Sequence, residues 1–336
     1  MSGAMPAAPN FPTLVQRFFL EGLIAQRNAS SRTIEAYRDS FRLFLAYLRE
    51  WKGLEPEDIT FTILGPEILS DFLLHLETDR GNSIRTRNAR LAAIRSFLRY
   101  ATTMDPASLG SIHRALSVPQ KRFNRPLLGF LTRQEMDSVL VAPDSGSWSG
   151  RRDRMLFQMM YNTGARVSET IAVTVKDVDR DHSHCVILHG KGRKERTVPL
   201  WRTTLRSLDA WVKENNFNPE TPLFPSAYGQ RMTRSGVEYR LRLAVQAALK
   251  DCHSLVAKDV SPHTIRHTTA MHLLQSGVDI SVIAIWLGHE SIVTTHMYLE
   301  ADLEMKEKAL AAIKEPKQKK NRFHASVGLI KFLESL

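Results

Sequence analysis

Length, composition and charge limit the kind of protein that this sequence can encode. Its 336 residues exceed one average domain, and 43% hydrophobic residues can form one or two buried cores. A net charge of +11 at pH 7 favours a polyanionic partner, nucleic acid first and an anionic membrane surface second. No apolar run reaches the roughly 18 residues of a spanning helix, and no signal peptide is recognisable. We therefore expect a cytoplasmic protein without membrane contact, in which Cys185 and Cys252 pack internally and form no disulfide.

The first third of the chain has the pattern of a helical domain. Residues 1–10 are rich in Pro and Ala and are expected to be disordered, whereas apolar residues then recur at helical spacing. A Ser N-cap at one helix start, and Pro66 in the first turn of another, are typical start signals. Four helices are predicted, over 11–27, 30–51, 65–80 and 82–101.

The fourth predicted helix has an apolar face beside a basic one. Its arginines would suit phosphate contacts in a groove, although an ordinary solvated face has the same pattern. The following segment, 117–131, contains two prolines and several basic residues without a clean period, so we predict a basic linker there. The candidate DNA-binding residues in the helix and the linker are Arg85, Arg87, Arg90, Arg95, Arg99, Lys121, Arg122 and Arg125.

A mixed pattern over 132–314 predicts a second domain. Two β-rich runs flank the glycine-containing turn that holds Lys191, which indicates a small antiparallel sheet. Helical patterns surround it, so the fold class is mainly α with one small sheet. The tail, 315–336, is basic and then amphipathic, and its last segment can pack on its own domain or on a neighbouring protomer. The predicted helices lie near 132–141, 151–163, 168–172, 201–216, 234–249, 261–277, 279–289 and 303–314, and the strands near 184–190 and 195–200.

The stretch HTIRH at 263–267 places two histidines one helical turn apart, which is the spacing of a helical zinc site. Arg266 argues against zinc because it is a permanent cation between them, and Thr264 stands where the zinc signature has a glutamate. A Ser-Pro pair marks the helix start, so His263 and Arg266 share a face near a helix N-terminus, which favours an anion. We therefore predict a phosphate site and no metal.

Four motifs follow one another in the second domain: TGARVSE with Arg166, GKGRKERTVPL with Lys191, HTIRH with Arg266, and LGHESIVTTHMYLE with His289 and Tyr298. In order and spacing they resemble the boxes of the tyrosine recombinases, the phage integrase family. The resemblance implies two domains, a helical, SAM-like core-binding domain over 11–116 and a mixed α/β catalytic domain over 132–314.

The resemblance also implies a site-specific recombinase that cleaves and rejoins DNA through a 3′-phosphotyrosine, without metal, cofactor or ATP. Arginines would stabilise charge on the phosphate oxygens, Tyr298 would attack, and Lys191 would protonate the leaving 5′-oxygen. His263 is the candidate base. Glu169 is expected to orient an arginine or a histidine, and His267 to pack or bond within its helix. The predicted catalytic residues are Arg166, Lys191, His263, Arg266, His289 and Tyr298.

The same family implies double-stranded DNA as partner, a homotetramer on two DNA sites, a monomer or weak dimer when free, accessory recombinases, and a location at the bacterial nucleoid. Integration, excision and transposition all fit. Three other functions stay open: a type IB topoisomerase, a catalytically silent DNA-binding subunit, and a zinc hydrolase. The helical N-terminal half favours recombination over relaxation, and the presence of all six catalytic side chains argues against a silent subunit.

Overall fold

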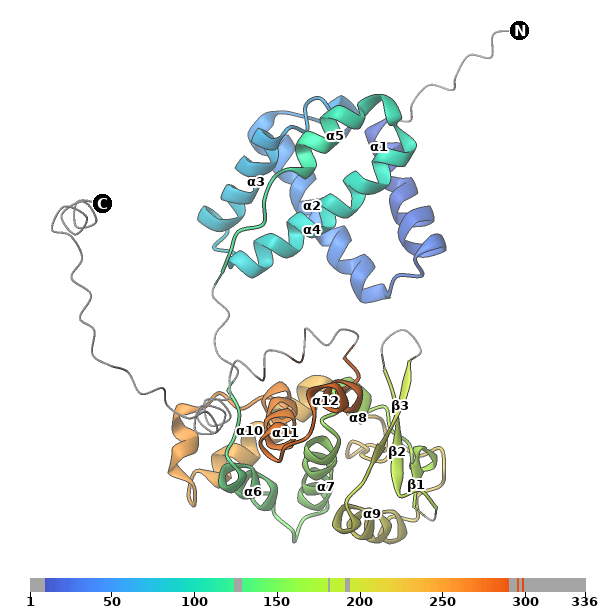
Figure 1. The fold of residues 1–336 in the computed structure, drawn as a ribbon, viewed down its shortest axis with the longest axis vertical. Coiled ribbons are helices and arrows are strands. Elements are labelled where there is room, and N and C mark those ends of the chain that lie inside the picture. Colours follow the sequence, from blue (N-terminus) through green and yellow to red (C-terminus); the bar gives the residue numbers. More distant parts are fainter. Residues whose placement is uncertain are drawn as a thin grey trace, which may run out of the picture. The chain divides into compact units, whose positions relative to one another are not determined.

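The computed structural model describes residues 10–123, 129–180, 182–190 and 194–289, together with Thr295 and Tyr298 (Figure 1). The chain divides into two compact units at Arg125 and Pro126. The first unit is helical, the second is mixed, and each has its own hydrophobic core. This confirms the predicted fold class, mainly α with a small antiparallel sheet. Within the described part of the chain, no helix is long and apolar enough to cross a membrane.

The first unit is a set of helices around a core rich in phenylalanine. The four predicted helices are present, and α4 buries its apolar face through residues such as Leu91, Ile94 and Leu98. A fifth helix, α5, was missed because its eight residues bury only Ile112 and Ala115 and give too short a periodic signal. The elements are α1 Phe11–Arg17, a π-helical stretch Phe18–Gln26, α2 Ser31–Lys52, α3 Pro66–Thr78, α4 Ile84–Met104 and α5 Leu109–Leu116.

The first predicted helix changes its winding part of the way along. After Arg17 the backbone forms a wider π-helix, so the helix predicted over 11–27 is present with two windings, α-helical to Arg17 and π-helical over Phe18–Gln26. The wider turns accompany close packing at Gly22, where a Cβ atom would come within 3.2–3.3 Å of the rings of Tyr100 and Phe18. Helical spacing in the sequence does not distinguish the two windings, because the choice depends on this tertiary contact.

The second unit contains a three-stranded antiparallel sheet in the order β1-β2-β3. The β2–β3 hairpin pairs Cys185 with Pro199 and His189 with Glu195, as the two β-rich runs predict. The strand β1 was missed because it has only two residues. The elements are α6 Arg133–Val141, α7 Trp148–Thr163, α8 Val167–Thr170, β1 Val178–Asp179, β2 Cys185–His189, β3 Glu195–Pro199, α9 Arg202–Glu214, α10 Arg234–Ala248, α11 Pro262–Gln275 and α12 Ile280–Leu287.

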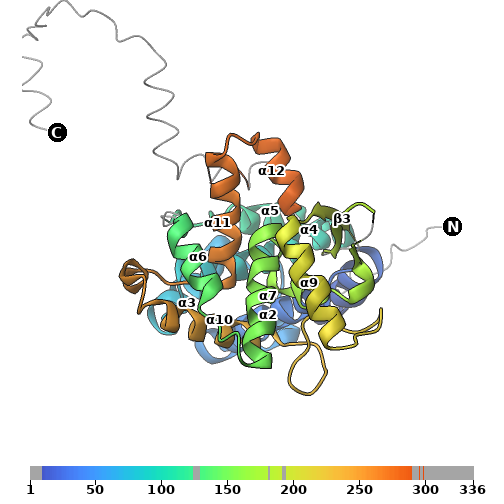
Figure 2. The same ribbon diagram turned by 90° about the horizontal axis from the view of Figure 1, so that it is seen from below.

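Helix α7 is the central element of the second unit (Figure 2). It packs against α11, α9 and α6, and most of its side chains are buried. It ends at Gly164, whose φ of +60° turns the chain so that α8 begins after Arg166. Leu287, the last residue of α12, lies directly against Gly164. The ends of α7 and α12 and the start of α8 therefore meet at one place.

Replacing Gly164 with alanine should destabilise this junction. The new Cβ would lie 2.5 Å from Cδ2 of Leu287, a side chain without solvent exposure, at a φ that disfavours alanine. We expect the free energy of unfolding, measured by urea denaturation, to fall by about 2–4 kcal/mol. Gly229→Ala is the matched control, since Gly229 has a φ of +74° and no neighbour within 4 Å, so only the backbone cost of about 1 kcal/mol applies. Equal losses in the two variants would contradict the close contact.

Candidate active site

Arg266 lies one turn into α11, where backbone carbonyls hold its guanidinium. The helix begins with the predicted Ser-Pro pair. Arg266 is 4% exposed, and it donates from Nη1 to Gly164 O at 2.7 Å and from Nη2 to Leu287 O at 2.8 Å. Burial and the charge of Arg166 lower the pKa of Arg266 to about 10. The side chain is therefore cationic at neutral pH and is fixed by the ends of α7 and α12.

Arg166 stands at the start of α8 and keeps one edge open to solvent. Its Nη1 donates to Glu169 Oε1 at 2.7 Å, and its backbone N–H donates to Glu169 Oε2 at 2.9 Å. Its Nη2 faces Gly288 O at 3.4 Å. The side chain of Arg166 is 38% exposed, whereas that of Glu169 is 3% exposed. Glu169 therefore orients Arg166 from the protein side and leaves its outer edge free for an anion.

A third arginine, which sequence reasoning missed, enters the same site from β3. Arg196 donates from Nη2 to Glu169 Oε2 at 2.7 Å and from Nε to Trp286 O at 3.0 Å. Its side chain is only 12% exposed. The alternation of side chains along the strand could have indicated that Arg196 faces inwards. Side chains two residues apart share a face of a strand, and Val198, two residues after Arg196, is buried.

The end of α12 collects all three guanidinium groups. Three successive carbonyls each accept a hydrogen bond from a different arginine: Trp286 from Arg196, Leu287 from Arg266, and Gly288 from Arg166. A helix leaves its last carbonyls without intrahelical partners, and its dipole is negative at that end. The cations of α8, β3 and α11 are therefore gathered on one helix C-terminus.

Tyr298 is buried, and its hydroxyl contacts a histidine other than the expected one. The side chain is 1% exposed and belongs to an apolar cluster with residues such as Met271 and Leu274. Its oxygen lies 3.1 Å from Nδ1 of His267. His263, the predicted base, lies one turn earlier, with its ring centroid 6.5 Å from that of His267. His267 therefore contacts the phenol, a partner outside its own helix that the sequence pattern did not indicate.

His289 follows α12 and lies beside Tyr298. Its Nδ1 is 2.8 Å from the hydroxyl of Thr295, and its ring is nearly parallel to that of Tyr298, with centroids 6.3 Å apart. Burial, together with the charges of Arg266 and other arginines, lowers the pKa of His289 to about 4. Burial and the neighbouring cations lower that of His267 to about 4 as well. Both imidazoles are therefore neutral at pH 7.

Tyr298 and His263 respond to the same surroundings. Burial raises the pKa of Tyr298, although the charges of Arg266 and Arg166 act in the opposite direction. Burial lowers the pKa of His263, and the charges of Arg234, Arg266 and Arg166 lower it further. The site thus combines neutral histidines with permanent cations, an arrangement that binds an anion better than a metal ion.

The basic residues of α4 and the predicted linker divide into internal and exposed groups. Arg87 is 9% exposed, donates to Pro119 O at 3.1 Å and pairs with Glu77 at 3.4 Å. Arg95 donates to Leu116 O at 2.7 Å. Arg87 thus binds the chain after α5, and Arg95 binds the end of α5 itself; the role of both as phosphate contacts stays a prediction. The others described are Arg85, Arg99 and Arg122, which are exposed, Lys121, which pairs with Glu77, and Arg90, which is half-buried.

Part of the predicted linker also belongs to the helical unit. Val118 is buried in its core. The side chain of Asn88 accepts from the backbone N–H of Lys121 at 3.1 Å and donates to its carbonyl at 2.8 Å. Residues 118–121 are therefore packed onto the first unit. Two predicted site residues, Lys191 and Arg125, lie outside the described residues.

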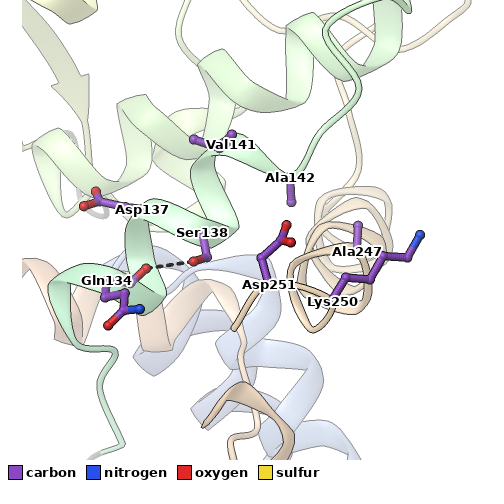
Figure 3. Close-up of a pocket in the computed structure, with 8 residues that line it drawn as sticks. All are labelled: Gln134, Asp137, Ser138, Val141, Ala142, Ala247, Lys250 and Asp251. Carbon is purple, nitrogen blue, oxygen red and sulfur yellow. Dashed lines mark hydrogen bonds between the residues drawn. The ribbon is translucent and has the colours of Figure 1, made fainter. Parts of the chain in front are cut away.

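A pocket elsewhere in the second unit is less suited to an anion (Figure 3). It lies beside α6 and the end of α10 and has a volume of about 830 Å³. The carboxylates of Asp137 and Asp251 line it, and none of the three site arginines does. Among the described residues, no group of three or more His, Cys, Asp or Glu side chains could hold a metal ion.

The buried carboxylate of Glu169 should make stability depend on pH. Burial raises its pKa, but hydrogen bonds from Arg196 and Arg166 outweigh burial and bring the pKa to about 2 from 4.5. Its stabilising effect is therefore complete above pH 4.5 and is lost as the pH falls towards 2. Between pH 7 and pH 3, the free energy of unfolding measured by urea denaturation should fall by about 2 kcal/mol less in Glu169→Gln than in the wild type.

Glu135 provides the matched control for this prediction. Its pKa is also lowered to about 2, because bonds from Lys258 and Ser254 outweigh burial, yet it contacts none of the site arginines. Glu135→Gln should therefore reduce the pH dependence by a similar amount, and the reductions from Glu135→Gln and Glu169→Gln should add in the double variant. Parallel stability curves for the wild type and Glu169→Gln would show that Glu169 is not the stabilising carboxylate.

Comparisons with known proteins identify the family of this chain. The model of the phage integrase family matches residues 129–305, and that of the phage integrase N-terminal SAM-like domain matches 17–104. The chain is 44% identical to "Putative integrase/recombinase y4rC" of Sinorhizobium fredii, over 96% of this chain and 97% of that protein. It is 31% identical to tyrosine recombinase XerD of Pseudomonas putida, over 83% of this chain and 90% of that protein.

Solved structures share the fold. The integrase of transposon Tn1549, in complex with transposon right end DNA, has a TM-score of 0.67 over 90% of this chain and 99% of that chain, at 16% identity. The recombinase XerH, in a pre-cleavage complex with its difH substrate, has a TM-score of 0.64 over 86% of this chain and 81% of that chain, at 22% identity. On the family matches and the relatives together, the chain belongs to the phage integrase family of tyrosine recombinases.

Proposed function

We propose that this chain is a site-specific recombinase that cleaves and rejoins double-stranded DNA through a covalent 3′-phosphotyrosine. The observation that carries the proposal is the convergence of Arg166 and Arg266 on the end of α12, beside His289 and Tyr298. The membership of the chain in the tyrosine recombinase family supports it.

The two arginines supply the anion site. A phosphodiester under attack develops negative charge on its non-bridging oxygens, which guanidinium groups bind in a bidentate manner. Arg166, whose outer edge is exposed, and Arg266, at the start of α11, are the groups that we assign to these oxygens. With Nδ1 of His289 bonded to Thr295, its Nε2 is the nitrogen that we assign to the phosphate.

Tyr298 supplies the nucleophile. Its oxygen attacks phosphorus, the bond from phosphorus to the 5′-oxygen breaks, and this oxygen takes a proton, which we assign to Lys191. A 5′-hydroxyl of another strand then attacks the phosphotyrosine and releases Tyr298. The number of phosphoester bonds is unchanged, so the cycle needs neither a metal ion nor ATP. Because Tyr298 is 1% exposed, the residues that cover it must move before a duplex reaches its oxygen.

Double-stranded DNA is the proposed partner, with a homotetramer assembled on two sites. The net charge of +11 favours a polyanion, and the Tn1549 integrase and XerH, which share this fold, have been solved with DNA. In the helical unit, the exposed side chains of Arg85, Arg99 and Arg122 are the phosphate contacts that we propose.

A nicked suicide duplex should trap the covalent intermediate. Duplexes would first be selected from random sequence by binding to the protein, then nicked and incubated with it, and adducts would be resolved under denaturing conditions. Tyr298→Phe should abolish the adduct, because the attacking oxygen is absent. Tyr161→Phe is the control, since Tyr161 is also buried, with its hydroxyl 2.7 Å from Nδ1 of His272, and should leave the adduct in place.

Other outcomes of this experiment would favour other functions. Tight binding without any adduct would contradict the proposal and favour a DNA-binding subunit. An adduct accompanied by relaxation of supercoiled DNA, without strand exchange, would favour a type IB topoisomerase.

The two histidines of α11 should separate in their pH profiles. We assign the base to His263 and the resting contact with Tyr298 to His267. A base must be neutral to accept a proton, so the wild-type rate should rise with pH through a pKa below 6.5 and then level off. His263→Gln should slow adduct formation by about 10²–10⁴-fold and remove that rise, whereas His267→Gln should keep the rise with less than about tenfold loss. The opposite pattern would assign the base to His267.

A further inference from the structure

Arg196 is the arginine of the site for which the proposed chemistry has no step. Its guanidinium is 12% exposed and spends its donors on protein atoms, Oε2 of Glu169 and the carbonyl of Trp286. Arg166 has an exposed outer edge, and Arg196 has none of comparable size. Unlike Arg266, whose two partners are neutral carbonyls, Arg196 has its charge paired with the carboxylate of Glu169, so we look for its effect in the groups that it holds.

We propose that Arg196 is a positioning residue, which sets the direction of Arg166 through Glu169 and fixes the chain immediately before His289. The inference deepens the proposed strand-cleavage function and rests on it. It assigns to β3 a role in the phosphate site that is separate from the role of Lys191 in the same hairpin.

The charge of Glu169 has to compensate for two cations. Glu169 has one negative charge and two arginine partners, Arg196 on Oε2 and Arg166 on Oε1. Burial removes water as an alternative partner for this carboxylate. Without Arg196, both carboxylate oxygens would compete for Arg166 in a bidentate pair, turning its guanidinium inwards. With Arg196 in place, one cation neutralises Glu169 and the charge of Arg166 remains available to an anion.

Arg196 also contacts the end of α12. The Nε of Arg196 binds Trp286 O, and a Cβ atom on Gly288 would come within 3.0–3.3 Å of the Arg196 side chain. The guanidinium thus lies directly against the left-handed turn from which His289 starts. A displacement of Arg196 would move this turn, and with it the carbonyls that hold Arg166 and Arg266.

The β2–β3 hairpin holds the backbone of Arg196 in place. Arg196 pairs with Leu188 across the β2–β3 ladder, and Leu188 has no solvent exposure, so the backbone at this position is fixed by the core. The side chain therefore connects this strand to Glu169 and to the end of α12. A rigid support of this kind is what a group needs if it must hold others in the geometry of reaction.

The experiment is a mutant cycle on Arg196 and Glu169, with single-turnover adduct formation and DNA affinity as readouts. Arg196→Met should slow adduct formation by on the order of 30-fold while the dissociation constant for DNA changes less than about threefold, since the loss falls on positioning. Adding Glu169→Gln to this variant should restore at least half of the loss on a logarithmic scale, because it removes the carboxylate that would otherwise hold Arg166 in a bidentate pair. A purely structural role would not produce such a rescue.

Arg152 provides a matched control. It is also buried, with one carboxylate partner, Asp153, and one carbonyl partner, Pro225 O at 3.0 Å, but it contacts none of the site residues. Arg152→Met should lower the melting temperature without changing the rate per folded molecule. Should Arg196→Met fail to fold, Arg196→Lys replaces it, because lysine keeps the charge but cannot reproduce the two fixed donors. It should slow adduct formation by about tenfold.

Several results would overturn the inference. One is that Arg196→Met, or Arg196→Lys if it takes its place, forms the adduct at the wild-type rate. Another is that the effects of Arg196→Met and Glu169→Gln on the rate of adduct formation simply add. If the wild type forms no adduct, the proposed function fails, and binding of inorganic vanadate then decides the inference separately. Vanadate affinity should fall by about tenfold in Arg196→Met and recover in the double variant, because the anion site depends on the direction of Arg166. Equal affinities would overturn the inference.

Discussion

The site depends on one short helix end that accepts hydrogen bonds from three arginines. Cations of like charge repel one another, so bringing Arg166, Arg196 and Arg266 together requires groups that compensate for this repulsion. The last carbonyls of α12 and the carboxylate of Glu169 provide that compensation. Because these carbonyls would otherwise lack partners in a buried place, the arginines also complete the helix. The same hydrogen bonds therefore complete the end of α12 and bring the three arginines of the anion site together.

The compensation is incomplete, which favours an anion at this site. Burial and the neighbouring guanidinium groups lower the pKa of Arg266 to about 10 and that of His289 to about 4, which shows that further positive charge is disfavoured there. A phosphate brought beside Arg166 relieves that repulsion. The relief increases as charge develops on the phosphate oxygens, so groups fixed before the substrate arrives stabilise the transition state more than the ground state.

Sequence reasoning recovered the parts of this site whose signals are local. The Ser-Pro start of α11 and the order of the motifs pointed to Arg166, Arg266 and Tyr298, which lie near the end of α12 in the structure, and amphipathic spacing predicted most helices. It did not recover contacts that depend on tertiary neighbours. The bridge from Arg196 to Glu169 joins β3 to α8, and His267 meets Tyr298 across 31 residues. Arg87 looked like a surface cation because its spacing does not reveal that Pro119 and Glu77 surround it.

The exposures of the reacting groups imply an order of events. Arg166 presents an open edge, with 38% of its side chain exposed, while Tyr298 is 1% exposed and its hydroxyl is held by His267. A phosphodiester can therefore reach the cationic edge before it can reach the nucleophile. Burial raises the pKa of Tyr298, so the phenol stays protonated and weakly reactive in this state. For the proposed chemistry, the phenol has to leave its apolar cluster and approach the arginines. Binding of the anion and release of Tyr298 are thus separate steps, and cleavage requires both.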